Sequence, residues 1–460
     1  MAINLKFWRT RTNIQTPLIQ VPDVTENDWT RVMLYKKYWD FYTGKQFPYK
    51  RQDGEIQSVL NYCGPLVDKS VQFLVGKPFN IETEDEEALP ILQSVWEGNS
   101  EVLKPMNIAQ MGGVTGDAWV KPIYDDKTER LRLIVLNSMF CFPEFEESDF
   151  ETLKKLKIIY PLGSTTDIRY FREEITAETI TQYHDKEKVL EIPNVLGEIG
   201  VVHIPNLPVA GCYYGRSDLQ DIIDLQIEFN EKLSDTSASI DYHASPITAI
   251  FGARAKQLEK GANRVWSGLP KDARVENIAG VGDLPATLRF LEILKLAFHE
   301  LTQTPESALG KFQPISNTSG VAMHMAYLPL MEKTEVKRLT YGTGFQKINE
   351  LILKIISIKQ RKTFKSLTNW VTFAEPLPKD ELIERQLIAQ DIGAGIESQE
   401  GGMRRIGKTE EEIVQIQQEI MEEKARELAL MYGTQEGVQN EEKGTKKKRT
   451  KKIRTGFEKQ

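Results

Sequence analysis

The residues of this 460-residue chain that could do acid–base or metal chemistry are its carboxylates, five histidines and three cysteines. The histidines, whose spacing fits no metal-ligand motif, are His184, His203, His243, His299 and His324. No G-x-x-x-x-G-K-S/T loop is present, so the sequence predicts no ATP hydrolysis. Gly393 and Gly395 lack the preceding strand and the third glycine of a dinucleotide loop. We therefore expect no enzyme, no metal and no cofactor.

Three other groups of residues could be taken for metal, catalytic or disulfide sites, but each has a simpler interpretation. The pair Asp221 and Asp224 is more typical of a solvated helix face or a subunit contact than of a metal site. His299 is expected to be packed or solvated. Cys63, Cys141 and Cys212 are far apart in apolar contexts, which favours reduced packing residues over a disulfide or metal set. No apolar run of membrane-spanning length and no signal-peptide pattern occurs, so we expect a protein of the cytosol.

Side chains that could contact phosphate form two groups. The segment 244–284 contains six basic and four acidic residues in a chain of net charge −7; the basic residues are Arg254, Lys256, Lys260, Arg264, Lys271 and Arg274. The segment 306–319 contains donors that could contact phosphate without reading bases, namely Lys311, Gln313, Ser316, Asn317 and Thr318. Plain surface charge for the first group and an ordinary surface turn for the second remain open.

The elements that must position these groups are long helices. Ser217 and Asp218 are N-cap candidates for a helix that continues to residue 243. A strand-containing insert follows at 244–284, with strands near Ile247–Phe251 and Val275–Ile278. A second helix is predicted over 285–305, with Asp283 as cap; its apolar stripe consists of Leu288, Leu291, Leu294, Ala297, Phe298 and Leu301. After the loop 306–319, a long helix covers 320–362, and Pro329 should kink it.

The flanking parts complete an α+β protein. An arm at 1–27 precedes a mixed α/β region at 28–214, with helices near Trp29–Thr43 and Ile56–Leu74 and a polar hairpin turn at Asp125–Lys127. Short strands are predicted near Ile81, Ala118–Tyr124, Leu131–Leu136, Lys157–Tyr160, Ile168–Phe171 and Ile180–Tyr183. A late strand at Leu367–Phe373 should return to this region from the segment 363–376.

The last part of the chain is predicted to be helical and then disordered. Two acidic helices are expected within 377–432, over Lys379–Ile392 and Lys408–Met431, broken by Gly393, Gly395, Gly401 and Gly402. The tail 433–460 is polar and, near its end, basic, which indicates disorder. A basic tail is usually just solvated, but it could also contact nucleic acid.

The order of these segments resembles the phage portal proteins of tailed bacteriophages. The resemblance rests on five stretches that occur in the family's order, at 61–82 (NYCGPLVDKSVQFLVGKPFNIE), 116–126 (GDAWVKPIYDD), 215–235 (GRSDLQDIIDLQIEFNEKLSD), 306–327 (ESALGKFQPISNTSGVAMHMAY) and 395–407 (GIESQEGGMRRIG). It implies a wing at 28–214 joined by 363–376, stem helices at 215–243 and 285–305, and a clip at 244–284. It further implies a tunnel loop at 306–319, a long kinked helix at 320–362 and a crown at 377–432.

The resemblance implies a function and partners. Such a protein forms a ring of about twelve subunits at one capsid vertex and passes double-stranded DNA during packaging and ejection. Its partners would be DNA, the terminase large subunit, the major capsid and scaffolding proteins, and a head–tail adaptor, with no membrane. It would be located in the virion, and in the host cytoplasm during assembly. The tunnel loop would contact passing DNA, and the clip would present its basic residues to the motor, the connector or DNA.

The charge distribution suits a channel better than a DNA clamp. The last 20 residues carry a local charge of +6, so the remaining chain is strongly acidic. Because tight DNA binding requires neutralised phosphates, an acidic body suits sliding, and in a ring each basic residue recurs once per subunit. Two alternatives of other classes stay open: a DNA-processing enzyme such as a nuclease, which would need convergent carboxylates, and a cytosolic scaffold that never meets DNA.

Overall fold

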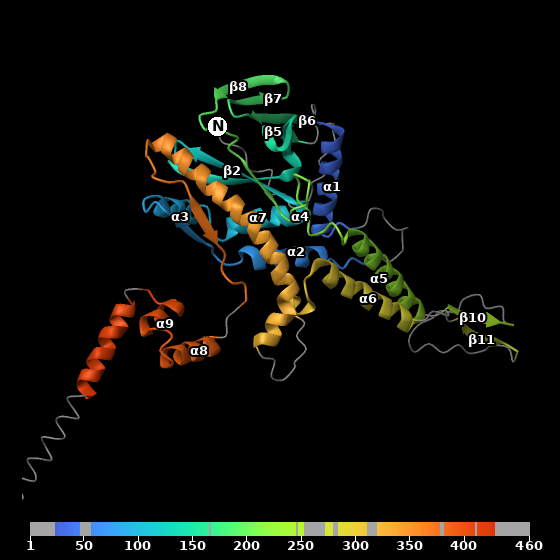
Figure 1. Ribbon diagram of the computed structural model, residues 1–460. Coiled ribbons are helices and arrows are strands. Elements are labelled where there is room, and N and C mark those ends of the chain that lie inside the picture. The colour runs from blue at the N-terminus through green and yellow to red at the C-terminus, as the bar shows by residue number, and fades with distance from the viewer. Residues whose placement is uncertain are drawn as a thin grey trace, which may run out of the picture. The chain divides into compact units, whose positions relative to one another are not determined.

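The computed structural model describes residues 24–46, 57–164, 167–244, 247–252, 272–278, 284–310, 320–377, 381–409 and 412–427. Contacts divide the chain into two compact units, Met1–Pro376 and Leu377–Gln460. The first unit combines helices with antiparallel sheets, so the predicted α+β class is confirmed (Figure 1). The basic tail at 433–460 and most of the arm at 1–27 lie outside the described residues.

Four helices build one side of the first unit: α1 (Glu26–Tyr42), α2 (Cys63–Val75), α3 (Ala88–Gly98) and α4 (Leu103–Thr115). The hydroxyl oxygen of Thr25 caps α1 by accepting a hydrogen bond from the Asp28 amide at 3.2 Å. The predicted start of α2 at Ile56 is wrong. Residues 57–62 are not helical, because their main chain is bound by side chains of a later helix, as described below.

Two antiparallel sheets cover the other side. The smaller has the order β3–β2–β9, with β2 (Asp117–Asp125), β3 (Arg130–Leu136) and β9 (Val202–Pro205). The larger runs β4–β5–β6–β7–β8 and places β8 at its outer edge (Figure 1); its strands are β4 (Cys141–Glu146), β5 (Asp149–Ser164), β6 (Asp167–Ile175), β7 (Thr179–His184) and β8 (Glu187–Pro193). The hairpin at Asp125–Lys127 is confirmed.

Strands β4, β8 and β9 were not predicted from the sequence. All seven residues of β8 are exposed, so β8 lacks the alternation of apolar and polar residues that marks a half-buried strand. The late strand was predicted correctly. It is β12 (Asn369–Thr372), and it pairs antiparallel with β1 (Asn80–Thr83).

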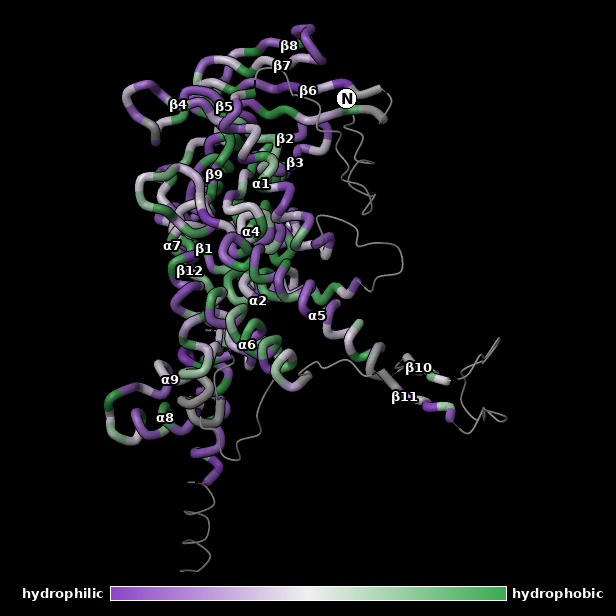
Figure 2. The backbone as a smooth tube through the Cα atoms, turned by 90° about the vertical axis from the view of Figure 1, so that its right-hand side faces the viewer, coloured by the Kyte–Doolittle hydropathy of each residue, from purple (hydrophilic) through white to green (hydrophobic). Residues whose placement is uncertain are grey.

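The main core lies where α2, α4 and α7 (Gly320–Gln360) meet the β2 sheet. Phe79, which precedes β1, packs its ring 5.1 Å from both Trp96 on α3 and Phe345 on α7. Figure 2 shows hydrophobic residues, in green, gathered along α2, α4 and α6 (Leu284–Thr302). Cys63 and Cys141 are buried as predicted, whereas Cys212 is exposed, so its assignment as a packing residue is wrong.

The helix predicted from Ser217 begins later, as α5 (Ile223–Ala244). The Ser217 hydroxyl accepts a hydrogen bond from the Leu219 amide at 3.0 Å, and this bond shapes a turn rather than the first turn of the helix. Strands β10 (Ile247–Phe251) and β11 (Arg274–Ile278) form the predicted antiparallel pair. Helix α7 contains Pro329, as predicted; since proline has no amide hydrogen, one backbone hydrogen bond is missing there.

The C-terminal unit contains α8 (Glu381–Gly393), α9 (Gln399–Arg405) and a helical stretch at 412–427. The prediction that Gly401 and Gly402 break a helix is wrong, because both lie inside α9. Gly402 is buried against α8, where a Cβ atom would approach the Ile388 side chain to 2.7 Å. A glycine at this position therefore lets α9 pack closely on α8.

Candidate nucleic-acid and subunit-contact sites

The structure describes only the residues at the two ends of the predicted tunnel loop. Lys311, Gln313, Ser316, Asn317 and Thr318 lie outside the described residues. Before them, the short helix η3 (Glu306–Leu309) ends at Gly310, whose φ of 93° is left-handed. After them, the Tyr327 hydroxyl on α7 donates a hydrogen bond to the Ser307 carbonyl at 3.1 Å. This bond joins the two sides of the loop, so both ends of the segment are held by named contacts.

The predicted clip is described only as the hairpin β10–β11. Arg254, Lys256, Lys260, Arg264 and Lys271 lie outside the described residues. Arg274 is on β11, and its guanidinium pairs with Glu276 at 3.0 Å. Both side chains point to the same face of the strand, because they are two residues apart. Part of the charge of Arg274 is therefore compensated within the hairpin.

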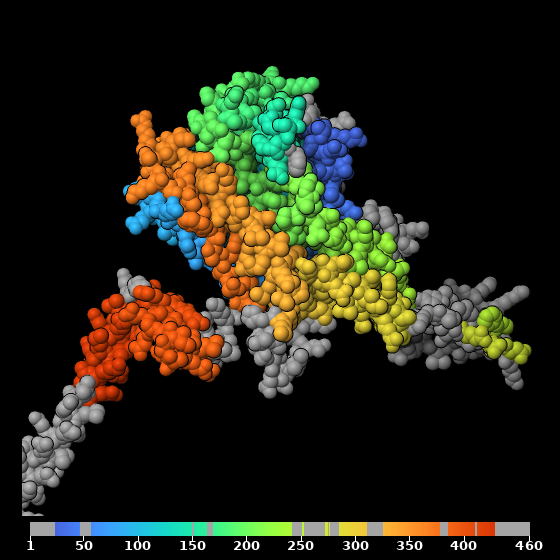
Figure 3. Space-filling view, in the orientation of Figure 1, coloured from blue at the N-terminus to red at the C-terminus, as the bar shows by residue number. Residues whose placement is uncertain are grey.

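Helix α6 has two apolar faces where the sequence predicted one stripe. Leu294 and Phe298 are buried against the body, and Phe298 stacks on Tyr62 with ring centroids 4.9 Å apart. Leu288 and Leu301, predicted for the same stripe, are exposed. A second group of apolar residues, which we call the outer face of α6, is also exposed and consists of Leu288, Phe290, Ile293, Leu296 and Leu301. Figure 3 shows α6 in yellow at the molecular surface, beside the orange α7.

Helix α5 binds an extended segment through a ladder of three polar side chains. Gln226, Asn230 and Ser234 are spaced by four residues and are all buried. They accept hydrogen bonds from the amides of Tyr62, Leu60 and Ser58 at 3.0, 3.0 and 2.9 Å, respectively. Four residues of helix span about 6.0 Å and two residues of extended chain about 6.6 Å, so three rungs fit with little strain.

Two side chains of this segment contribute little to its binding, whereas Tyr62 packs on Phe298. Val59 and Leu60 remain 45% and 47% exposed, so at these two positions the contact is made mainly through the main chain. The ladder was not predicted. Its only signal in the sequence was the repeat of polar residues on an otherwise apolar helix face.

A buried cluster of charges lies where α5, α6 and α7 join the body. Asp218, in the turn before α5, pairs with Lys337 at 2.5 Å and with Lys333 at 3.1 Å. Lys337 also donates to the Ser70 hydroxyl on α2 at 2.8 Å, and Lys333 donates to the carbonyl of Thr302, the last residue of α6, at 3.1 Å. We call Asp218, Lys333 and Lys337 the charge hub. Asp218 was predicted as a helix cap, so its role in the hub was missed.

The hub shifts the pKa values of its own members. Burial opposes ionisation of Asp218, but Lys333 and Lys337 outweigh it and hold the pKa of this carboxyl well below its usual range. Burial lowers the pKa of Lys337 to about 8, with Lys333 acting in the same direction and Asp218 in the opposite one. The hub therefore sets two buried lysines against one carboxylate that stays ionised.

A second buried carboxylate, Asp117 at the start of β2, also holds several elements together. It accepts hydrogen bonds from the Tyr35 hydroxyl on α1, from the Gly215 amide at 2.9 Å and from His203 Nε2 on β9 at 2.7 Å. The His203 ring stacks on Tyr213 with centroids 4.5 Å apart. All these donors are packed inside the protein, so the cluster is arranged as a structural junction.

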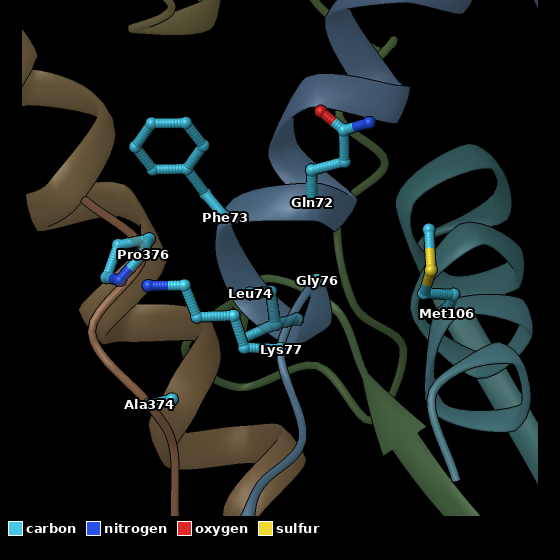
Figure 4. Close-up of a pocket in the computed structure, with 8 residues that line it drawn as sticks. All are labelled: Gln72, Phe73, Leu74, Gly76, Lys77, Met106, Ala374 and Pro376. Atoms are coloured by element: carbon cyan, nitrogen blue, oxygen red, sulfur yellow. The ribbon is translucent and has the colours of Figure 1, made fainter. Parts of the chain in front are cut away.

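A cavity with a volume of 260 Å³ lies between the end of α2, helix α4 and residues 374–376 (Figure 4). Its lining consists of Gln72, Phe73, Leu74, Gly76, Lys77, Met106, Ala374 and Pro376. Lys77 is the one ionisable side chain among them, and its ammonium donates to the Glu375 carbonyl at 2.5 Å. The lining offers no pair of groups for acid–base catalysis.

Two searches of the described residues gave negative results. In the described ranges, no group of three or more His, Cys, Asp or Glu side chains is placed to hold a metal ion. Among the helices that the structure describes, none combines the length and apolar character needed to cross a membrane.

Comparison with known proteins identifies the class. Residues 23–427 match a family described as phage portal protein, SPP1 Gp6-like. The match covers most of the chain, which is therefore a phage portal protein by class. More narrowly, the chain belongs to the SPP1 Gp6-like family of portal proteins. Comparison with curated proteins found no match.

Chains in solved structures of a gene transfer agent (GTA) are also similar. One, described as the virion of the native GTA particle, shares 14% identity over 75% of this chain and 89% of that chain, with a TM-score of 0.48. A chain in the neck of the empty particle, computed with C6 symmetry, shares 13% identity over 75% of this chain and 90% of that chain, with a TM-score of 0.49. A chain in the neck of the native particle, computed with C12 symmetry, shares 14% identity over 76% of this chain and 91% of that chain, with a TM-score of 0.46. Since these TM-scores are below 0.5, the assignment rests on the family match.

Proposed function

We propose that this portal-family protein forms a ring-shaped channel at one capsid vertex, through which double-stranded DNA is packaged and later ejected. The ring would contain about twelve copies of the chain and would have no enzymatic activity of its own. During packaging it would dock the terminase large subunit, and afterwards the head–tail adaptor. It would contact the major capsid and scaffolding proteins during assembly in the host cytoplasm and remain in the virion.

The observation that carries this proposal is the family match over residues 23–427. It includes the described parts of every segment named from the sequence between the wing and the crown. The assignments of wing, stem, clip, tunnel loop and crown to the ranges given above are part of the proposal. So are the DNA contacts of Lys311, Gln313, Ser316, Asn317 and Thr318, and the basic surface of the clip.

The outer face of α6 supports assembly into a ring. Five large apolar side chains are exposed along an element that is already packed on its other side, and the exposed charged residues Arg289, Glu292 and Glu300 lie between them. Exposed apolar surface bordered by polar residues marks protein–protein contacts. A closed ring uses a heterologous interface, in which this patch would meet a different surface of the next copy. We propose that the outer face of α6 is one half of that interface.

The charge of the chain supports a channel through which DNA slides. A net charge of −7, despite a basic tail, gives DNA little attraction along most of the surface. Repetition of a few basic residues around a ring would create narrow rings of positive charge, which centre a duplex without trapping it. A nuclease and a DNA-independent scaffold are the two competing functions.

Mass measurement and negative-stain imaging of the purified full-length chain test the proposal. The expected result is a closed ring with a central hole and a mass that is an integral multiple of 52.6 kDa. A monomer or dimer that cleaves DNA with added metal ions would overturn the proposal in favour of a nuclease. A compact oligomer without a hole that is indifferent to DNA would favour the scaffold.

A further inference from the structure

The charge hub joins helices α6 and α7 to the elements on which they pack. On one side are α7, which supplies Lys333 and Lys337, and the end of α6, whose Thr302 carbonyl binds Lys333. On the other side are Asp218 before α5 and Ser70 on α2. Asp218 is itself fixed, because its amide donates to the Gly113 carbonyl of α4 at 2.9 Å. The attachment of α6 and α7 to α2 and α4 thus passes in part through three charged groups.

The hub is unbalanced in charge. Both lysines are buried, and together they face a single carboxylate. A buried charge without a full partner is costly, because the low-polarity interior solvates it poorly. The imbalance favours any conformation in which one ammonium reaches water or loses its proton.

The groups that face Lys337 define how it titrates. Asp218 approaches it from the turn before α5, and Lys333 lies one turn earlier on α7. Helix α2 contributes the neutral Ser70 hydroxyl, and the Tyr341 hydroxyl on α7 donates to Asn206 at 3.1 Å. With burial as the main cause, the pKa of Lys337 falls from 10.5 to about 8 in the closed hub. In an open conformation, exposed to water, this pKa would return towards 10.5.

Helix α7 contains a weak point next to the hub. Pro329 lies four residues before Lys333 and cannot donate a hydrogen bond to the preceding turn. The turns of α7 on either side of Pro329 are therefore joined by fewer backbone hydrogen bonds than the rest of the helix. Because Lys333 and Lys337 lie after Pro329, opening of the hub requires the turns 330–337 to shift together with the turns before them.

We propose that the charge hub is a proton-driven latch: uptake of one proton favours its opening, which releases α6 and the first half of α7 from α2, α4 and the turn before α5. The closed hub binds fewer protons than the open one, so lowering the pH drives opening. This device does not depend on what passes through the proposed channel.

The sign and size of the effect follow from linkage. Between pH 9 and pH 7, an open lysine stays protonated, whereas the closed Lys337 takes up its proton only as the pH falls through about 8. The ratio of open to closed hub should therefore rise about tenfold over this interval. Below pH 7 it should rise little further, because the closed state is then protonated as well.

Hydrogen exchange of the purified full-length protein at pH 9 and pH 7, corrected for the intrinsic exchange rates, tests the latch. Peptides from 284–302 and 320–337 should show about tenfold more opening at pH 7. In Lys337→Met, Asp218 keeps Lys333 as its partner, the excess charge is gone, and the pH effect should disappear. Lys337→Gln removes the same titrating ammonium but keeps a donor for the Ser70 hydroxyl, so it replaces Lys337→Met if that variant does not fold.

The chain offers a matched control on the same helix. Glu198 pairs with both Lys347 and Lys354 of α7, so it too faces two lysines, but these side chains are partly exposed. Lys347→Met removes one lysine there and should leave the pH dependence of the two peptides unchanged. Equal opening at pH 9 and pH 7 in the wild type would overturn the latch. A tenfold pH effect that persists when Lys337 is replaced would also overturn it.

Discussion

Tyr62 and Phe298 stack with their ring planes 23° apart, and this contact joins the extended segment before α2 to the buried face of α6. Phe229 on α5 packs edge-on against both rings. The three aromatic rings thus fasten α5 and α6 to the N-terminal body. The orientation that they give to α6 decides which of its apolar residues are buried and which remain available to a second chain.

Two neighbouring residues of α6 should therefore respond differently to the same change. Leu294 is 7% exposed and Ile293 is 61% exposed. Leu294→Asp places a charge in the core and should destabilise the fold by more than about 3 kcal/mol. Ile293→Asp should leave the fold intact but prevent ring formation, because it places a charge in the proposed subunit interface.

Thermal unfolding and native mass measurement separate the two effects. Val189 on β8, which is 57% exposed and lies outside α6, provides a matched control: Val189→Asp should change neither the melting temperature nor the assembly. Intact rings from Ile293→Asp would show that the outer face of α6 is not in the interface. Normal folding of Leu294→Asp would contradict the packing described for α6.

The polar ladder of α5 should be sensitive at its middle rung. Asn230→Leu removes the acceptor of the Leu60 amide and the donor to Gln46, while the side chain keeps its branching and its number of non-hydrogen atoms. An unsatisfied buried polar group costs about 1–3 kcal/mol, so the free energy of unfolding should fall by about that amount. Val59→Thr, which changes an exposed side chain of the bound segment, should have almost no effect.

Urea denaturation of both variants measures this difference. Faster hydrogen exchange at residues 57–62 in Asn230→Leu would locate the effect at the ladder. Equal stabilities of Asn230→Leu and the wild type would mean that the ladder contributes nothing to holding the segment.

The proposed clip surface can be tested without disturbing assembly. Replacing Arg254, Lys256 and Lys260 together by glutamine removes three positive charges from each subunit. Docking of the packaging motor, or entry of DNA into the ring, should become less efficient, because repeated charges around a ring act together. Rings should form as in the wild type, and a packaging assay on them should show reduced yield. An unchanged yield would remove these residues from the proposed function.

The proposed tunnel loop makes a salt-dependent prediction. Lys311→Glu changes the charge by two units per subunit, and repulsion of DNA should lower packaging or DNA retention. The defect should be largest at low salt, since exposed charges are screened over about 8–10 Å at ordinary ionic strength. Packaging by assembled variant rings is measured at two salt concentrations, with Lys311→Gln as the control for loss of the positive charge alone. Full packaging at low salt would mean that Lys311 does not contact DNA.

Local patterns in the sequence determined much of the fold. The 3.6-residue spacing of apolar side chains identified α6 and α7 to within a few residues, because the side chains that a helix buries recur at this spacing in its own sequence. Alternation likewise identified β2, β3 and the β10–β11 pair. Alternation failed to identify β8, because all its residues are exposed. The glycine pattern misled the prediction of α9, where Gly402 was interpreted as a break but allows close packing on α8.

The buried polar contacts depended on the tertiary structure. Asp218 looked like a helix cap because its neighbours in the sequence are those of a helix start, yet its partner Lys337 lies 119 residues further along the chain. Asn230 and Leu60 are separated by 170 residues. The sequence alone could show that α6 is amphipathic, but not that its apolar residues divide into a buried and an exposed face. A buried polar or charged group must find its partner in space, and which distant residue lies within hydrogen-bonding reach is decided only when the helices and sheets pack together.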